Sequence, residues 1–292
     1  MDKREQAAAV AVLAAALLIG CSTQTGIGQR GATQVLLTDA PFPYDQVSRV
    51  DVYIERISAS GTVDTNGHEP GTIVAPHKRF NLLDLSNGVV ADLGTGSLLT
   101  GSYVQVWVTM NADSSSITLK NNTVLTSGHG INWYGPSVFS IIVFTDPPLQ
   151  VTEQGAVVVI DFNLGRSFRP VNPADASAGF EFIGYIAALN TALTGSLRGA
   201  VTGAGDGPIP DASVTLLQKN PVYPADTATW GVLGTARTDA AGLFRMPYVR
   251  PGTSYTLVVE APSSSTFGAV AGSVAVARGA ETQVGTIVVP VK

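Results

Sequence analysis

The feature that most constrains the fold of this chain is the spacing of its apolar residues, which recur with the period of a β-strand. Val50, Val52 and Ile54 alternate with aspartate, tyrosine and glutamate. Such alternation places one face of a strand in the core. The runs 141–144 and 157–160 are apolar throughout, which is typical of strands buried on both faces. Because no long amphipathic helix pattern accompanies them, the sequence predicts an all-β protein.

Composition supports short strands joined by turns and excludes one class of partner. Charged residues make up 13% of the 292 residues, and the chain contains 31 glycines and 17 prolines. Asn66-Gly67 and Asn87-Gly88 are dipeptides that favour tight turns. The net charge is −5, and no basic stripe or arm is present, which argues against a nucleic-acid partner.

The first residues have the pattern of an export signal. Lys3 and Arg4 precede an apolar run, 7–19, which at about 1.5 Å per residue is too short to cross a hydrocarbon core of about 30 Å. Gly20 and Cys21 follow, and Cys21 is the single cysteine of the chain. This arrangement resembles a bacterial lipoprotein signal. The resemblance implies a helical signal peptide over 1–20, cleavage between Gly20 and Cys21, and acylation of Cys21.

The resemblance also implies a location. A lipidated Cys21 anchors an exported chain to a lipid bilayer, since each buried CH₂ contributes about 0.8 kcal/mol. Ser22 rather than aspartate follows the cysteine, which favours the outer membrane where the cell has one. Residues 21–33 are small and polar and predict a flexible tether between lipid and folded body. Two alternatives are a secreted protein in which this cysteine is incidental and an uncleaved anchor.

The remainder divides into two predicted β domains, 34–190 and 194–292, with a junction between them. A turn-rich loop is expected over 168–180 and a last strand of the first domain over 180–188. Beyond residue 193, strands recur at spacings of about ten residues with glycine or proline between them, the rhythm of a small sandwich. The expected architecture is therefore two tandem β-sandwich-type domains after the signal peptide.

The first of these domains resembles a bacterial and archaeal family called domain of unknown function 4382. The resemblance rests on five ordered segments: LTDAP at 37–41, the strand 47–57, FNLLDL at 80–85 with Asn87-Gly88, GSYVQ at 101–105, and IDFNL at 160–164 with Ser167. It implies an exported β domain that is common on lipoproteins, and it implies no known activity.

The second domain resembles the carboxypeptidase regulatory-like domain, a transthyretin-like sandwich grouped with carbohydrate-binding-like folds. Four segments carry this resemblance: GSLRG at 195–199, PIPDASV at 208–214, TDAAGLF at 238–244 and VRPGTSYTL at 249–257. These are residues that make turns and strands, so the resemblance implies a fold and transfers neither an enzyme activity nor a sugar site.

Residues for catalysis or metal binding are sparse. His68, His77 and His129 stand in loops without zinc-ligand spacing, and neither a nucleophile elbow nor a phosphate loop is present. The sequence therefore predicts no catalytic residues, no metal site and no cofactor. One alternative stays open, an unrecognised hydrolase that uses Asp39, Asp84 and Asp161. These carboxylates would converge as an acid pair or bind calcium through their oxygens. Hydrogen bonding of each carboxylate at a strand end is the competing interpretation.

Aromatic residues in loops provide the candidate binding site. Trp133 and Tyr134 lie in a turn-rich loop, and Trp230 precedes a predicted strand of the second domain. Exposed rings stack on the C–H faces of sugars, so these three residues predict carbohydrate contact; ordinary packing is the alternative for each. We expect a non-enzymatic envelope lipoprotein that binds or scaffolds, with a polysaccharide or an envelope protein as partner. A structural, adhesin-like protein whose strand edges pair with other chains is the alternative.

Overall fold

The computed structural model describes residues 28–40, 45–61, 70–205, 207–226, 229–262 and 269–290. Nearly all regular structure is β. The strands are β1 (Arg30–Ala40), β2 (Val47–Ser60), β3 (Gly71–Val74), β4 (Lys78–Asn81), β5 (Ala91–Leu99), β6 (Gly101–Leu119), β7 (Val124–Ser127), β8 (Gly130–Asn132), β9 (Val138–Val151), β10 (Ala156–Asn163), β11 (Phe168–Pro170), β12 (Phe180–Phe182), β13 (Ile186–Asn190), β14 (Gly195–Gly203), β15 (Ser213–Gln218), β16 (Gly231–Arg237), β17 (Leu243–Val249), β18 (Gly252–Glu260), β19 (Ala269–Val276) and β20 (Glu281–Val289). Within the described residues, four short helical segments join them: η1 (Leu82–Gly88), α2 (Leu164–Ser167), η2 (Ala176–Ala178) and η3 (Thr191–Leu193).

The strands β1 to β13 form a first unit of two sheets. One sheet has the order β13-β10-β1-β5, and the other contains nine strands with β6 and β2 at its centre. Within the smaller sheet β1 is parallel to β10 and antiparallel to β5. Val35, Leu37, Val158 and Ile160 face the larger sheet across one apolar core. The prediction of an all-β fold is confirmed.

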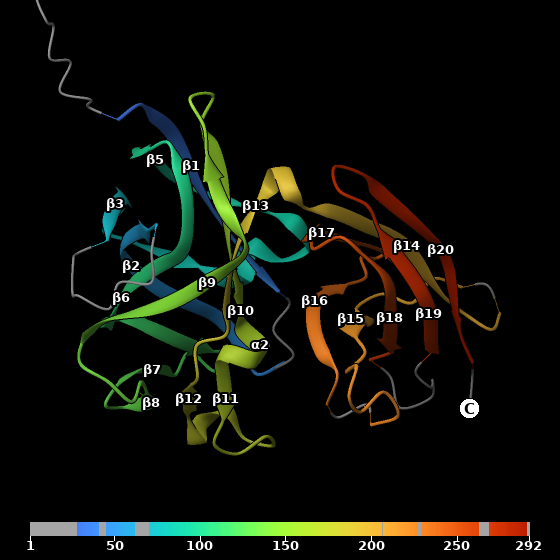
Figure 1. Cartoon of the computed structure of the whole chain (residues 1–292). Helices are drawn as coiled ribbons and strands as arrows, with labels where there is room; N and C mark the ends of the chain where they lie inside the picture. The colour runs from blue at the N-terminus through green and yellow to red at the C-terminus, as the bar shows by residue number, and fades with distance from the viewer. Residues whose placement is uncertain are drawn as a thin grey trace, which may run out of the picture.

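The strands β14 to β20 form a second unit with its own core. A sheet of three strands, in the order β17-β14-β20, faces a sheet of four, β16-β15-β18-β19. Leu197, Val201, Leu216 and Leu257 are completely buried between them. The two units lie side by side in Figure 1, with β1 beginning at the outer end of the first unit and β20 on the far side of the second.

Two predicted strand environments have different outcomes. Val158, Val159 and Ile160 on β10 are fully buried. Because successive residues of a strand face opposite sides, both faces of β10 are covered at these positions, and β13 and β1 flank its two edges. The run 141–144 is not buried on both faces. Ile142 and Phe144 are exposed on one face of β9, whereas Val143 between them is buried on the other. Among the described strands β9 pairs with β6 alone, so it is also an edge strand.

Two predicted boundaries are also corrected. The strand expected over 180–188 is two strands in different sheets, β12 and β13, because the chain turns at Gly184, which has φ +77°. β1 begins at Arg30 and pairs there with Leu99, so the last residues of the expected tether 21–33 belong to the sheet. In the described part of the chain, no helix has the length and apolarity that a membrane crossing requires.

Candidate functional site

The predicted anchor residues lie outside the described part of the chain. Gly20 and Cys21 both precede Gly28, the first described residue. Their predicted cleavage and lipidation therefore stay a prediction from sequence. The loop position of His68 and the tight turn at Asn66-Gly67 also stay predictions, because these residues fall in the undescribed range 62–69.

Trp133 is a core residue, which corrects the expectation that its ring is exposed. Its side chain is buried, and its ring centroid lies 4.6 Å from that of Phe182 and 5.5 Å from that of Phe168. Phe139 completes this aromatic cluster. Contacts of this kind stabilise through area and ring geometry. The Trp133 ring therefore packs in the core beneath the loop and does not offer a ring face to a ligand.

Tyr134 is the exposed member of the predicted pair, with 67% of its surface accessible. The Asn132 side chain accepts a hydrogen bond from the Tyr134 backbone N–H at 3.1 Å, and Tyr134 has φ +50°. This local turn directs alternate residues to opposite sides, so Trp133 enters the core and Tyr134 faces solvent. A hollow of about 430 Å³ lies beside the loop and is lined by Asn132, Tyr134 and Phe180 among others.

A charged pair that sequence reasoning missed holds the Tyr134 phenol. Tyr134 Oη donates to Glu181 Oε1 at 2.6 Å, and Arg169 Nε donates to Glu181 Oε2 at 2.9 Å. The hydrogen bond from Tyr134, and after it the one from Arg169, lowers the pKa of Glu181. In turn, the hydrogen bond to the Glu181 carboxylate raises the pKa of Tyr134. Arg169 and Glu181 face each other on β11 and β12. β11 lies in the expected loop 168–180, whereas β12 lies in the strand expected over 180–188, so no pattern in the sequence paired Arg169 with Glu181.

Trp230 lies at an intermediate depth in the second unit. Lys219 Nζ stands 5.3 Å from the centroid of the Trp230 ring. In this cation–π arrangement the exposed Lys219 side chain covers one face of the ring. The predicted contact of Trp230 with sugar therefore has one face at most to use.

The three aspartates of the hydrolase alternative have different surroundings. Asp39 is buried, and its Oδ1 accepts from the backbone N–H of Leu164 at 3.0 Å. Asp161 pairs in register with Thr38, one residue before Asp39. Because successive residues of a strand face opposite sides, Asp39 and Asp161 stand on opposite faces of the sheet. Asp84 is exposed on η1. Asp39 and Asp161 thus do not form a facing acid pair.

The junction between the units is built from hydrogen bonds on both sides. Asn190 Oδ1 accepts from the backbone N–H of Ala192 and so caps η3. Arg278 Nε donates to the carbonyl of Ala192 at 2.7 Å, and the backbone N–H of Gly279 donates to the carbonyl of Thr194 at 2.8 Å. The connecting residues are thereby tied to the second unit at Ala192 and Thr194.

A second contact joins the units through the turn Asn87-Gly88 at the end of η1. Asn87 Oδ1 accepts from the backbone N–H of Arg237 on β16 at 2.9 Å. Gly88, at φ +88°, lies so near β17 that an added Cβ would stand 3.1 Å from Pro247 Cγ. The sequence predicted a tight turn here. Its use as a contact between units depends on tertiary structure and carries no sequence signal.

We predict that Gly88→Val loosens this contact. A β-branched residue at positive φ costs about 1–3 kcal/mol of strain, and its side chain collides with Pro247. Small-angle X-ray scattering should give a larger maximum dimension than for the wild type. Gly128→Val is the matched control, because Gly128 also has positive φ (+70°) but no atom lies within 4 Å of its added Cβ. Equal scattering from both variants would contradict the assigned contact.

Solved structures with some likeness to the chain are distant. A 9R-lipoxygenase from Cyanothece PCC8801 is 16% identical with a TM-score of 0.24, covering 35% of this chain and 17% of its own. The Bacillus anthracis TIE protein is 9% identical with a TM-score of 0.30, covering 100% of this chain and 45% of its own. The shaft pilin spaA from Lactobacillus rhamnosus GG is 10% identical with a TM-score of 0.25, covering 89% and 98%. At these scores the likenesses carry no argument about function.

The sequence comparisons are more informative for the first unit. No curated protein matches the chain. The family model described as "Domain of unknown function (DUF4382)" matches residues 30–179, just over half of the chain. The match covers β1 to η2 and includes Trp133, Tyr134 and the three aspartates. The resemblance of 194–292 to the carboxypeptidase regulatory-like domain stays a prediction. The chain belongs to the DUF4382 family.

Proposed function

We propose that this chain is a non-catalytic scaffold of the cell envelope, held to a membrane by lipid on Cys21. The observation that carries the proposal is the junction, where Ala192, Thr194 and Asn87 bind residues of the second unit. A junction bonded on both sides favours a fixed arrangement of the two units. A scaffold requires such rigidity, because position is what it supplies.

The direction of the chain supports an anchor at one end. The described chain starts at the outer end of the first unit, away from the second unit (Figure 1). A lipid attached upstream of that point would leave the second unit farthest from the bilayer. In this proposal the carboxypeptidase regulatory-like unit is the distal part, and the outer membrane is the favoured location where the cell has one.

We predict that Cys21→Ala abolishes the anchor. Without the thiol no acyl chain can be attached, and the free energy of about 0.8 kcal/mol per buried CH₂ is lost. Incorporation of a labelled fatty-acid analogue should disappear, and the protein should leave the membrane fraction. Ser22→Ala is the control and should keep both properties. Labelling that persists in Cys21→Ala would overturn the anchor.

The hollow beside Tyr134 supports the finer proposal of carbohydrate binding. Tyr134 supplies an exposed ring, and the polar side chain of Asn132 lines the same hollow. Glu181 and Arg169 are hydrogen-bonded in series to the Tyr134 phenol. Sugar sites combine such a ring with a few oriented polar groups. Retardation of the protein in gels that contain a soluble glycan, lost in Tyr134→Ala, tests this role.

A second candidate function is adhesion through a protein partner, and β9 is the observation that favours it. Ile142 is 41% exposed and Phe144 is 62% exposed on the outer face of this strand. Exposed apolar side chains on an edge strand favour pairing with another chain. Capture of an envelope protein that depends on Phe144 and not on Tyr134 would favour adhesion over glycan binding.

A further inference from the structure

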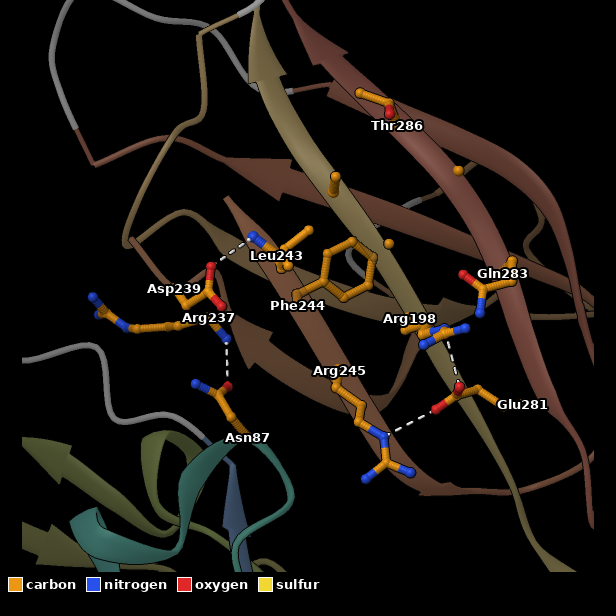
Figure 2. A pocket seen from close by; sticks show the side chains of 13 residues that line it. Asn87, Arg198, Arg237, Asp239, Leu243, Phe244, Arg245, Glu281, Gln283 and Thr286 are labelled. Carbon is orange, nitrogen blue, oxygen red and sulfur yellow. Dashed lines mark hydrogen bonds and ion pairs between the residues drawn. The ribbon is translucent and has the colours of Figure 1, made fainter. Parts of the chain in front are cut away.

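A cleft of about 550 Å³ runs along the outer face of the sheet β17-β14-β20, beside the turn that carries Asn87. It is separate from the Tyr134 hollow, which lies in the first unit. Figure 2 shows its side chains, which come mainly from the three strands β14, β17 and β20 of the second unit. Arg237 at the end of β16, Asp239 in the turn that follows, and Asn87 on η1 of the first unit complete the lining. The order of the residues across these strands gives the cleft two chemically distinct rows.

The first row is polar and cationic. Arg245 on β17, Arg198 on β14 and Gln283 on β20 are partners in register across the sheet. Glu281 accepts from the Nε of Arg198 and from the Nε of Arg245, each at 3.0 Å, and the two guanidinium groups converge on it in Figure 2. Both arginine side chains are 57% exposed. A guanidinium carries five N–H donors, so these contacts orient the arginines and leave donors for a ligand.

The second row is apolar and flat. Leu243, Ala200 and Thr286 are partners in register on the same three strands. Leu243 is 52% exposed, and Ala200 has no side chain beyond Cβ. Their side chains share the outer face with the arginines, because the neighbouring Phe244 and Val201 point into the core. An apolar floor therefore lies directly beside the cationic row.

We propose that this cleft binds a polysaccharide that contains uronic acids. Arginine pairs bind carboxylates through paired, charge-assisted hydrogen bonds. A uronic acid carries a carboxylate on the rim of a ring whose C–H face is apolar, so the ring covers Ala200 and Leu243 while the carboxylate meets Arg198 and Arg245. Gln283 and Asn87 stand where ring hydroxyls need hydrogen-bond partners. An extended chain of such sugars fits a site that is open along the sheet.

The test uses the full chain in detergent and measures binding of oligogalacturonate by titration calorimetry. We expect binding that weakens as salt is added and that is lost when the carboxylates are methyl-esterified. Arg245→Gln should weaken binding by about tenfold or more, as the loss of a charge-assisted hydrogen bond predicts. Arg79→Gln, an exposed arginine on β4, is the control and should bind as the wild type does.

Several results would overturn the proposal. Absence of binding to oligogalacturonate, equal binding of the methyl ester, or equal affinity of Arg245→Gln and Arg79→Gln would each do so. Equal binding of dextran sulfate, a polyanion without uronic acids, would show an unspecific arginine patch and would overturn the assignment to uronic acids. Because the comparison of acid with ester uses the wild-type protein, it remains decisive if an arginine variant fails to fold. Loss of the Tyr134 site or of the lipid anchor leaves this test unchanged.

Discussion

Replacement of Trp133 by alanine is expected to destabilise the first unit by about 3–5 kcal/mol. The indole packs against Phe139, Phe168 and Phe182, so its removal leaves a cavity at the centre of an aromatic cluster. A loss of this size is a large part of the stability of an ordinary domain. Urea unfolding followed by circular dichroism should show the transition of the first unit at a much lower midpoint.

Two matched variants separate packing from binding. Trp133→Phe should lose less stability than Trp133→Ala, because it keeps an aromatic ring and removes an Nε1–H that has no partner among the described residues. Tyr134→Ala should leave the midpoint almost unchanged, since the ring is exposed. If Trp133→Ala is as stable as Tyr134→Ala, the buried position of Trp133 is wrong.

Replacement of Asp161 by asparagine is expected to stabilise the protein above about pH 6. Removal of the carboxyl from water raises its pKa from 3.8 to about 6. The folded state therefore holds this proton more tightly than the unfolded state. The contribution of this protonated carboxyl to the free energy of unfolding is fully present below about pH 4 and is lost as pH rises through about 6. At about 1.36 kcal/mol per pKa unit the full effect is at most about 3 kcal/mol.

Denaturation measured from about pH 4 to pH 7 checks this prediction. Wild-type stability should fall across that window relative to Asp161→Asn, and the gap should close at the acidic end. Asp84→Asn is the matched control on the exposed part of η1 and should follow the wild type. A constant difference between wild type and Asp161→Asn at every pH would mean that the carboxyl does not titrate as described.

The regular part of the fold follows from local pattern. The alternation at Val50, Val52 and Ile54 becomes β2 with those residues fully buried. The four-residue run 157–160 becomes the central strand β10. A similar run, 141–144, becomes an exposed edge instead. A continuous apolar run is compatible with either position, because the number of neighbours of a strand depends on long-range pairing.

The positions of the candidate site residues depend on tertiary contacts more strongly than the regular strands do. A turn at Asn132 decides which of Trp133 and Tyr134 enters the core, and both have the same appearance in the sequence. The cleft row Arg245, Arg198 and Gln283 comes from three strands that are far apart along the chain. The register between the strands creates this row, and the register cannot be predicted from the sequence of one strand alone.

The most direct test of the account is the intact mass of the protein extracted from the membranes of its native host. We predict a chain that begins at Cys21 and carries the added mass of acyl groups on that residue. Fragmentation should place the lipid on residue 21. A chain that retains residues 1–20, or one with an unmodified Cys21 thiol, would contradict a scaffold anchored by lipid.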